Sequence, residues 1–118
     1  MAEGLSVHCF DIARGVVAEG MRVEVFICEP EMRLICEGRA GADALVTQAA
    51  LASRYVPGLY EIAFYVADYF RATHVGLPTV PFLDVVRYRF QVDSADTHYH
   101  FPFKVTPWGY SLFVTTSR

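Results

Sequence analysis

The chain has 118 residues, of which 53% are hydrophobic and 19% charged, and its formal net charge is −3. This composition suits one folded domain spanning residues 1–118 and excludes a disordered chain. Because no basic patch and no long apolar run is present, we expect neither a nucleic-acid partner nor a membrane span. The N-terminus lacks a signal-peptide pattern and the three cysteines lack CxxC spacing, so we expect a cytoplasmic protein with reduced thiols.

Alternation of apolar and polar residues dominates the chain and predicts short β-strands. In chain order these strands cover residues 5–10, 21–28, 32–37, 59–66, 85–92, 97–105 and 110–116. Turn residues separate several of them, as at Glu29-Pro30-Glu31 and Pro57-Gly58. Seven or eight strands predict an all-β fold, an antiparallel sandwich or barrel.

Two segments interrupt this strand pattern. Residues 67–74 predict the one short helix, with Asp68 near its start and Gly76 and Pro78 beyond its end. Residues 38–53 are ambiguous, because the Ala-rich stretch 47–53 has helical propensity. We expect a short strand and a loop there, because the surrounding strands need a sheet partner.

Two motifs carry a more specific pattern. The first is LSVHCFDIARG at residues 5–15, and the second is HYHFP at 98–102, followed by TPWGYS at 106–111. They resemble the H-V-L-D-T-A-x-G and H-Y-H-V-P…S-P-W-G-Y-S signatures of the transthyretin / 5-hydroxyisourate hydrolase family. Residues 57–61, 68–70 and 81–86 also resemble family segments, so the resemblance covers nearly the whole chain.

The resemblance implies a fold, an assembly and a reaction. The fold would be a transthyretin-like two-sheet, eight-stranded antiparallel sandwich with one short helix. The assembly would be a homotetramer, a dimer of dimers, with active sites in a channel between the dimers. The reaction would be the opening by water of the N1–C6 amide of a small-molecule substrate, 5-hydroxyisourate, in purine catabolism. Neither a metal nor an organic cofactor would be used.

The resemblance also implies site residues. His8 and His100 match the family's two site histidines, and imidazole suits proton transfer because it titrates near neutrality. Ser111 matches a hydroxyl that lines the channel. His98 lies two residues from His100 and therefore on the same sheet face, where we expect it to support the site. The three histidines could alternatively bind zinc, and Asp11 is expected to cap the turn that follows it.

Two departures mark the chain as a divergent member. Leu45 stands where the family's A-D-G-R segment has its substrate-binding arginine, although Arg39 or Arg54 could replace that group. Phe113 stands where the terminal Y-R-G-S motif has its tyrosine, and residues 114–116 replace R-G-S. We expect Leu45, Phe113 and Thr115 to line the substrate.

Three functions follow from this pattern. Because leucine suits a substrate that has lost N–H groups and charge, we expect a hydrolase for an N-methylated, trimethyl 5-hydroxyisourate. Hydrolysis of 5-hydroxyisourate itself is the second reading. The alternative from a different class is a non-catalytic, transthyretin-like binder of a flat aromatic ligand, in which the histidines are remnants.

Overall fold

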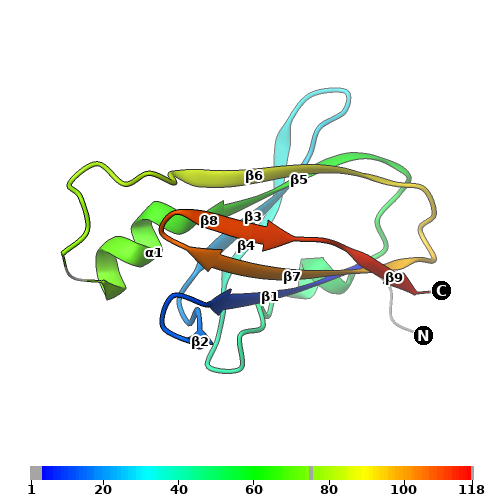
Figure 1. Cartoon of the computed structure of the whole chain (residues 1–118). Coiled ribbons are helices and arrows are strands. Elements are labelled where there is room, and N and C mark those ends of the chain that lie inside the picture. The colour runs from blue at the N-terminus through cyan, green and yellow to red at the C-terminus, as the bar shows by residue number, and fades with distance from the viewer. Residues whose placement is uncertain (1–3, 75, 118) are drawn as a thin grey trace.

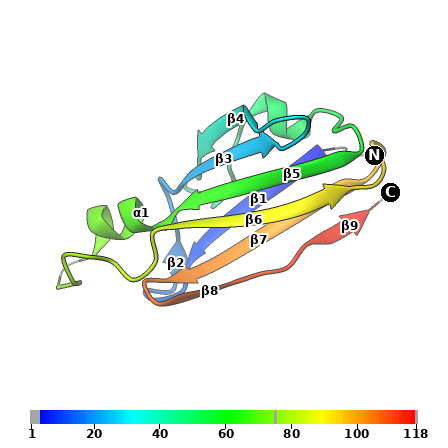
Figure 2. The same cartoon turned by 90° about the horizontal axis from the view of Figure 1, so that it is seen from above.

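The computed structural model describes residues 4–74 and 76–117 as two packed β-sheets with a short helix at one end (Figure 1). One sheet has the strand order β2-β1-β7-β8, with β9 also paired to β7, and the other has the order β4-β3-β5-β6 (Figure 2). The elements are β1 (Gly4–Asp11), β2 (Val16–Val17), β3 (Arg22–Ile27), β4 (Arg33–Arg39), the 3-10 helix η1 (Ala49–Ala52), β5 (Gly58–Tyr65), α1 (Val66–Thr73), β6 (Val85–Val92), β7 (His98–Thr106), β8 (Gly109–Leu112) and β9 (Thr115–Ser117). The expected two-sheet sandwich is confirmed.

The core forms where alternate residues of the two sheets meet. Val7 of β1 and Phe101 of β7 are fully buried, and Phe64 of β5 stacks on Phe103 of β7 with 3.9 Å between ring centroids. Because side chains alternate along a strand, the residues between these ones point away from the core. The outer face of the β2-β1-β7-β8 sheet therefore carries every second residue of β1 and β7.

One strand pair departs from the expected antiparallel arrangement. β1 and β7 pair in parallel over eight residues, from Gly4 opposite His98 to Asp11 opposite Val105. The pattern of the sequence could not reveal this, because β1 and β7 are separated by the whole second sheet and no hairpin dictates their direction. The parallel register brings the two family-like motifs side by side.

The expected last strand, 110–116, is broken into β8 and β9. Both pair with β7 in one continuous register, with Leu112 opposite Phe103 and Thr115 opposite His100. The same register puts Phe113 opposite Pro102, which has no N–H to donate to a neighbouring strand. The ladder is therefore interrupted at residues 113–114 and resumes at Thr115.

The Ala-rich segment is also different from the expectation. It forms the 3-10 helix η1 rather than a strand and loop. The residues just before it already form backbone hydrogen bonds with the edge of β1. The Ala44 carbonyl accepts from the Cys9 N–H, and the Val46 N–H donates to the Val7 carbonyl. With that pairing made, the alanines follow their helical propensity. By contrast, α1 lies where the short helix was predicted.

The remaining features concern the membrane and the thiols. No helix within the described residues is long and apolar enough to cross a membrane. The three cysteines, Cys9, Cys28 and Cys36, are free thiols in this structure.

Candidate active site

The outer face of the β2-β1-β7-β8 sheet gathers the predicted site residues, and we call it the histidine face. Its members alternate with core residues along β1 and β7 and along the segment from β8 to β9. They are Ser6, His8, Phe10, His98, His100, Pro102, Lys104, Ser111, Phe113 and Thr115, with Leu45 beside β1.

The central row of the histidine face contains Leu45 and Phe113, the two residues expected to depart from the family motifs. His8 pairs with Pro102 on one side and bridges Leu45 on the other. Phe113 lies opposite Pro102 by register, and it points outward because Leu112 and Val114 on either side pack on the core. Phe113 is 57% exposed in the single chain. Leu45 thus lies beside His8, and Phe113 lies beyond Pro102 in the same row, so apolar side chains stand on both sides of the His8–Pro102 pair.

The structure brings the two predicted histidines together. The imidazole rings of His8 and His100 have centroids 4.8 Å apart and meet edge to face at 76°. His8 also stacks on Phe10, with 5.8 Å between ring centroids. Both histidines are half-buried, so each ring is accessible from the open side of the sheet. One small ring-shaped molecule on this face could contact both.

A serine that the motif comparison missed links two of the histidines. Ser6 lies opposite His100 in the β1–β7 register. Its Oγ is 2.6 Å from Nδ1 of His100 and 2.8 Å from Nε2 of His98. The signal was present in the sequence, because Ser6 lies two residues before His8 and shares its face. However, only the pairing with β7 puts Ser6 against the HYH motif.

The environment of His100 favours its neutral form. Burial lowers the pKa of His100 below the ordinary histidine value, and the neighbouring His8 and His98 lower it further. Each effect disfavours a positive charge on the ring. With Nδ1 directed at Ser6, Nε2 is the nitrogen of His100 left to take a proton from a bound molecule.

The other predicted residues take outer positions. Thr115 lies opposite His100 in the adjacent strand. Ser111 lies opposite Lys104, two rows from His100, and within the described residues it makes no hydrogen bond to either His8 or His100. Its catalytic role therefore stays a prediction.

Neither arginine considered as a substitute reaches the histidine face. Arg39 donates to the carbonyl of Gly20, and Arg54 forms an ion pair with Asp96 at 2.7 Å. The cation that this face does carry is Lys104, which sequence reasoning overlooked. Its position opposite Ser111 marks the edge of the candidate site.

The geometry does not support the zinc alternative. Within residues 4–74 and 76–117, no three His, Cys, Asp or Glu side chains form a group that could hold a metal ion. Ser6 stands between His98 and His100 and occupies the nitrogens that face each other. Hydrogen bonds to Ser6 therefore hold the side chains of His98 and His100 in this arrangement.

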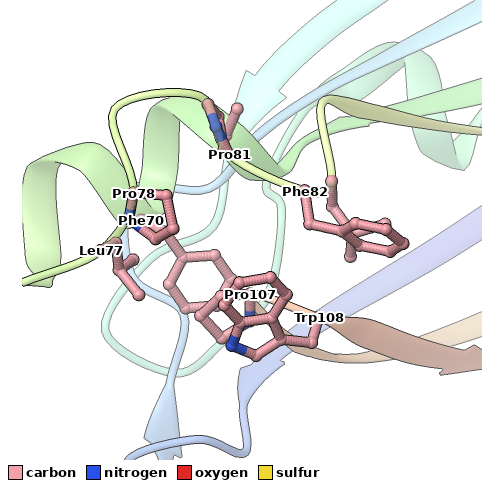
Figure 3. A pocket seen from close by; sticks show the side chains of 9 residues that line it. Phe70, Leu77, Pro78, Pro81, Phe82, Pro107 and Trp108 are labelled. Carbon is pink, nitrogen blue, oxygen red and sulfur yellow. The ribbon is translucent and has the colours of Figure 1, made fainter.

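An apolar pocket lies apart from the histidine face (Figure 3). It is formed by α1, the loop after it and the turn between β7 and β8. The ring centroids of Phe82 and Trp108, which both line it, are 5.9 Å apart. Its walls are apolar or aromatic: Ala67, Phe70, Leu77, Pro78, Pro81, Phe82, Leu83, Pro107 and Trp108. None of the predicted site residues lines it, and it offers no acid or base for chemistry.

Comparison with known proteins identifies similar chains. The chain is 41% identical over 113 residues to a 5-hydroxyisourate hydrolase of Deinococcus radiodurans, covering 93% of both proteins. It is 36% identical over 111 residues to a 5-hydroxyisourate hydrolase of Pseudomonas aeruginosa, covering 92% of this chain and 88% of that one.

Solved structures extend the likeness. An (S)-allantoin synthase crystal structure matches with a TM-score of 0.86 and 32% identity, over 97% of this chain and 44% of that one. A sea bream transthyretin, solved in complex with thyroxine, shares the fold with a TM-score of 0.81 and 19% identity, over 96% of this chain and 95% of that one. The family described as HIUase/Transthyretin matches residues 5–114. The chain therefore belongs to the HIUase/transthyretin family.

Proposed function

We propose that the protein is a cytoplasmic hydrolase that opens the cyclic amide of a 5-hydroxyisourate-type purine catabolite. The observation that carries this proposal is the pair His8 and His100, 4.8 Å apart on an open sheet face. The curated relatives named 5-hydroxyisourate hydrolase support the reaction class. The chemistry needs a neutral base, a donor for the developing oxyanion and a surface for a flat ring.

In the proposed mechanism His100 activates water. Its lowered pKa keeps the ring neutral near pH 7, so Nε2 can take a proton as water attacks the amide carbonyl. A ring N–H of His8 donates to the carbonyl oxygen, where negative charge develops. His100 then returns its proton to the leaving nitrogen as the carbon–nitrogen bond breaks. The proton taken from water thus ends on the released ring nitrogen, the hydroxyl ends on the carbonyl carbon as part of a carboxylic acid, and no cofactor is needed.

The finer proposal is that the substrate is N-methylated, with a trimethyl 5-hydroxyisourate as the best fit. Leu45 beside His8 and Phe113 beside Pro102 present apolar surface in the central row, where the family arginine and tyrosine would stand. Burial of methyl groups against such surface favours binding, whereas N–H groups would lose their hydrogen bonds to water without gaining protein acceptors there. Because Arg39 and Arg54 are bonded elsewhere, neither provides the missing donors in the single chain.

The test is a stopped-flow absorbance assay with two freshly generated substrates, 5-hydroxyisourate and its trimethyl analogue. Wild type should accelerate ring opening above the spontaneous rate and should have the higher kcat/KM for the trimethyl analogue. His100→Asn should lower kcat by about a hundredfold or more, because its proton transfer is lost. An unchanged rate in His100→Asn would assign the base to His8.

The same assay separates catalysis from binding alone. If neither substrate is opened faster than it decays spontaneously, the hydrolase proposal is wrong. Saturable binding of an aromatic ligand without turnover would instead favour a carrier, for which the apolar row around His8 provides a surface.

A further inference from the structure

The hydroxyl of Ser6 lies between two imidazoles, and this arrangement restricts where protons can sit. Oγ is 2.6 Å from Nδ1 of His100 and 2.8 Å from Nε2 of His98, both within hydrogen-bond distance. A hydroxyl carries one proton, so it donates to one nitrogen and accepts from an N–H of the other. The protonation of one histidine therefore dictates the protonation of the other.

Two arrangements satisfy both hydrogen bonds with neutral rings. In the first, His100 carries its proton on Nδ1 and donates to Ser6, and Ser6 donates to a bare Nε2 of His98. Nε2 of His100 is then bare and can act as a base. In the second, Nε2–H of His98 donates to Ser6, Ser6 donates to a bare Nδ1 of His100, and Nε2 of His100 carries a proton that it can give away.

We propose that Ser6 and His98 are positioning residues that form a proton relay with His100. Building on the proposed hydrolysis, the relay converts His100 from base to acid during one turnover. During the relay the hydrogen bonds change from the directions of the first arrangement to those of the second, and His98 carries the proton gained from water as a positive charge, so no group moves by more than a hydrogen-bond length.

The relay step balances in protons. As water attacks, its proton goes to Nε2 of His100, the Nδ1 proton passes to Oγ of Ser6, and the Ser6 proton passes to Nε2 of His98. His98 then carries the positive charge, while His100 is neutral with a proton on Nε2. When the carbon–nitrogen bond breaks, the Nε2 proton goes to the leaving nitrogen, and the other two protons return along the same path.

Charge placement is the benefit of the relay. His8 lies 4.8 Å from His100, so an imidazolium at His100 would stand beside a second ring that serves the substrate. The environment of His100 already disfavours its charged form. Moving the charge to His98 puts it one relay step away from the substrate and leaves His100 as a neutral donor.

The kinetic test compares three variants in single-turnover stopped-flow experiments. Ser6→Ala removes the hydroxyl, Ser6→Thr keeps it, and Ser117→Ala removes an exposed hydroxyl opposite His98 in the β7–β9 register. Ser6→Ala should lower the ring-opening rate at least about tenfold, since general acid–base catalysis contributes about 10²–10⁴-fold in total. Ser6→Thr should recover most of the rate, and Ser117→Ala should match wild type.

A solvent isotope measurement distinguishes relay from packing. In mixtures of H2O and D2O the wild-type rate should depend on the deuterium fraction along a curve, because several protons move in one step. The Ser6→Ala rate should depend on it linearly, because one proton then moves. A linear dependence in wild type, or an equal loss in Ser6→Ala and Ser6→Thr, would overturn the relay.

A measurement without substrate keeps this inference separate from the proposed function. In ¹⁵N spectra of histidine side chains, Ser6→Ala should shift Nδ1 of His100 and Nε2 of His98 together, whereas unchanged resonances overturn the link. If wild type opens neither substrate, the proposed function fails and the relay fails with it. If wild type is active and Ser6→Ala is equally active, the relay alone is wrong.

Discussion

Leu45 is the residue expected to replace the substrate-binding arginine of the family motif. It bridges His8 across the edge of β1 and is half-buried, so a side chain at this position meets whatever contacts His8. The residue before it, Ala44, holds a positive φ of 72°, which is unusual for a residue other than glycine. This backbone turn directs Leu45 toward the histidine face.

Leu45→Arg should shift substrate preference toward 5-hydroxyisourate. Burial of one methyl contributes about 0.8 kcal/mol, so two or three methyls favour the trimethyl substrate by roughly 2 kcal/mol, or about 30-fold. A guanidinium would restore donors for the N–H-rich substrate and lose that apolar contact. The ratio of the two kcat/KM values measures the change.

The matched control is Leu34→Arg. Leu34 is an exposed leucine on β4 in the other sheet, so the substitution should leave the ratio unchanged. An unaltered ratio in Leu45→Arg would show that this position does not distinguish methylated from unmethylated rings.

His100 determines the expected pH dependence. Activity needs the neutral ring, so kcat/KM should fall as the pH drops through the pKa of His100. Because burial and then the two neighbouring histidines lower that pKa, the acid limb should lie below the ordinary histidine value. His8→Gln should move the limb to higher pH, since one source of repulsion is removed while burial remains. If the acid limb of the pH profile stays at the same pH or moves to lower pH in His8→Gln, the limb reports the titration of a group other than His100.

At the scale of elements, Asp11 ties the end of β1 to α1. Its carboxylate accepts hydrogen bonds from the backbone N–H groups of Ala13 and Arg14, which confirms the predicted turn cap. It also accepts from the Tyr69 hydroxyl at 3.0 Å and from Arg14 Nε at 3.1 Å. Because Asp11 is completely buried, these donors depend on it for their partners.

Asp11→Ala should therefore lower the free energy of unfolding by about 2–4 kcal/mol, because it leaves the buried Tyr69 hydroxyl and two N–H groups without an acceptor. Urea unfolding followed by circular dichroism measures the change. The control is Asp68→Ala on α1, whose exposed ion pair with Arg71 should contribute less than about 1 kcal/mol. Equal losses in the two variants would contradict the assigned role of Asp11.

At the scale of the whole molecule, we expect a homotetramer in which a second copy covers the histidine face. On this face Phe113 is 57% exposed in the single chain, and Ile12 and Val16 are exposed at the adjoining end of β1 and on β2. Such a concentration of exposed apolar surface is characteristic of an interface. The open site would then become a channel between copies.

Light scattering at micromolar concentration should give four times the chain mass of 13.3 kDa. Phe113→Asp should give a lower mass, because a carboxylate buried at an apolar interface costs several kcal/mol. Val80→Asp, at an exposed loop position, should keep the wild-type mass. A monomer mass for wild type would rule out the tetramer.

The sequence alone determined the local features of this protein. Alternation predicted the strands, including β6 with its observed bounds, because a strand with one buried face must repeat every two residues. The same period put His98 with His100, and Ser6 with His8, on common faces. Asp11 was recognisable as a turn cap because its bonds reach only two and three residues along the chain.

Only the tertiary structure decided which of these faces meet. Ser6 and His100 are 94 residues apart, and their contact depends on a parallel β1–β7 pairing that no hairpin imposes. The position of Phe113 opposite Pro102 and of Leu45 opposite His8 likewise follows from register between distant strands. A period of two specifies the face of a residue but not its neighbour across the sheet, because that neighbour is chosen by the packing of the whole sandwich.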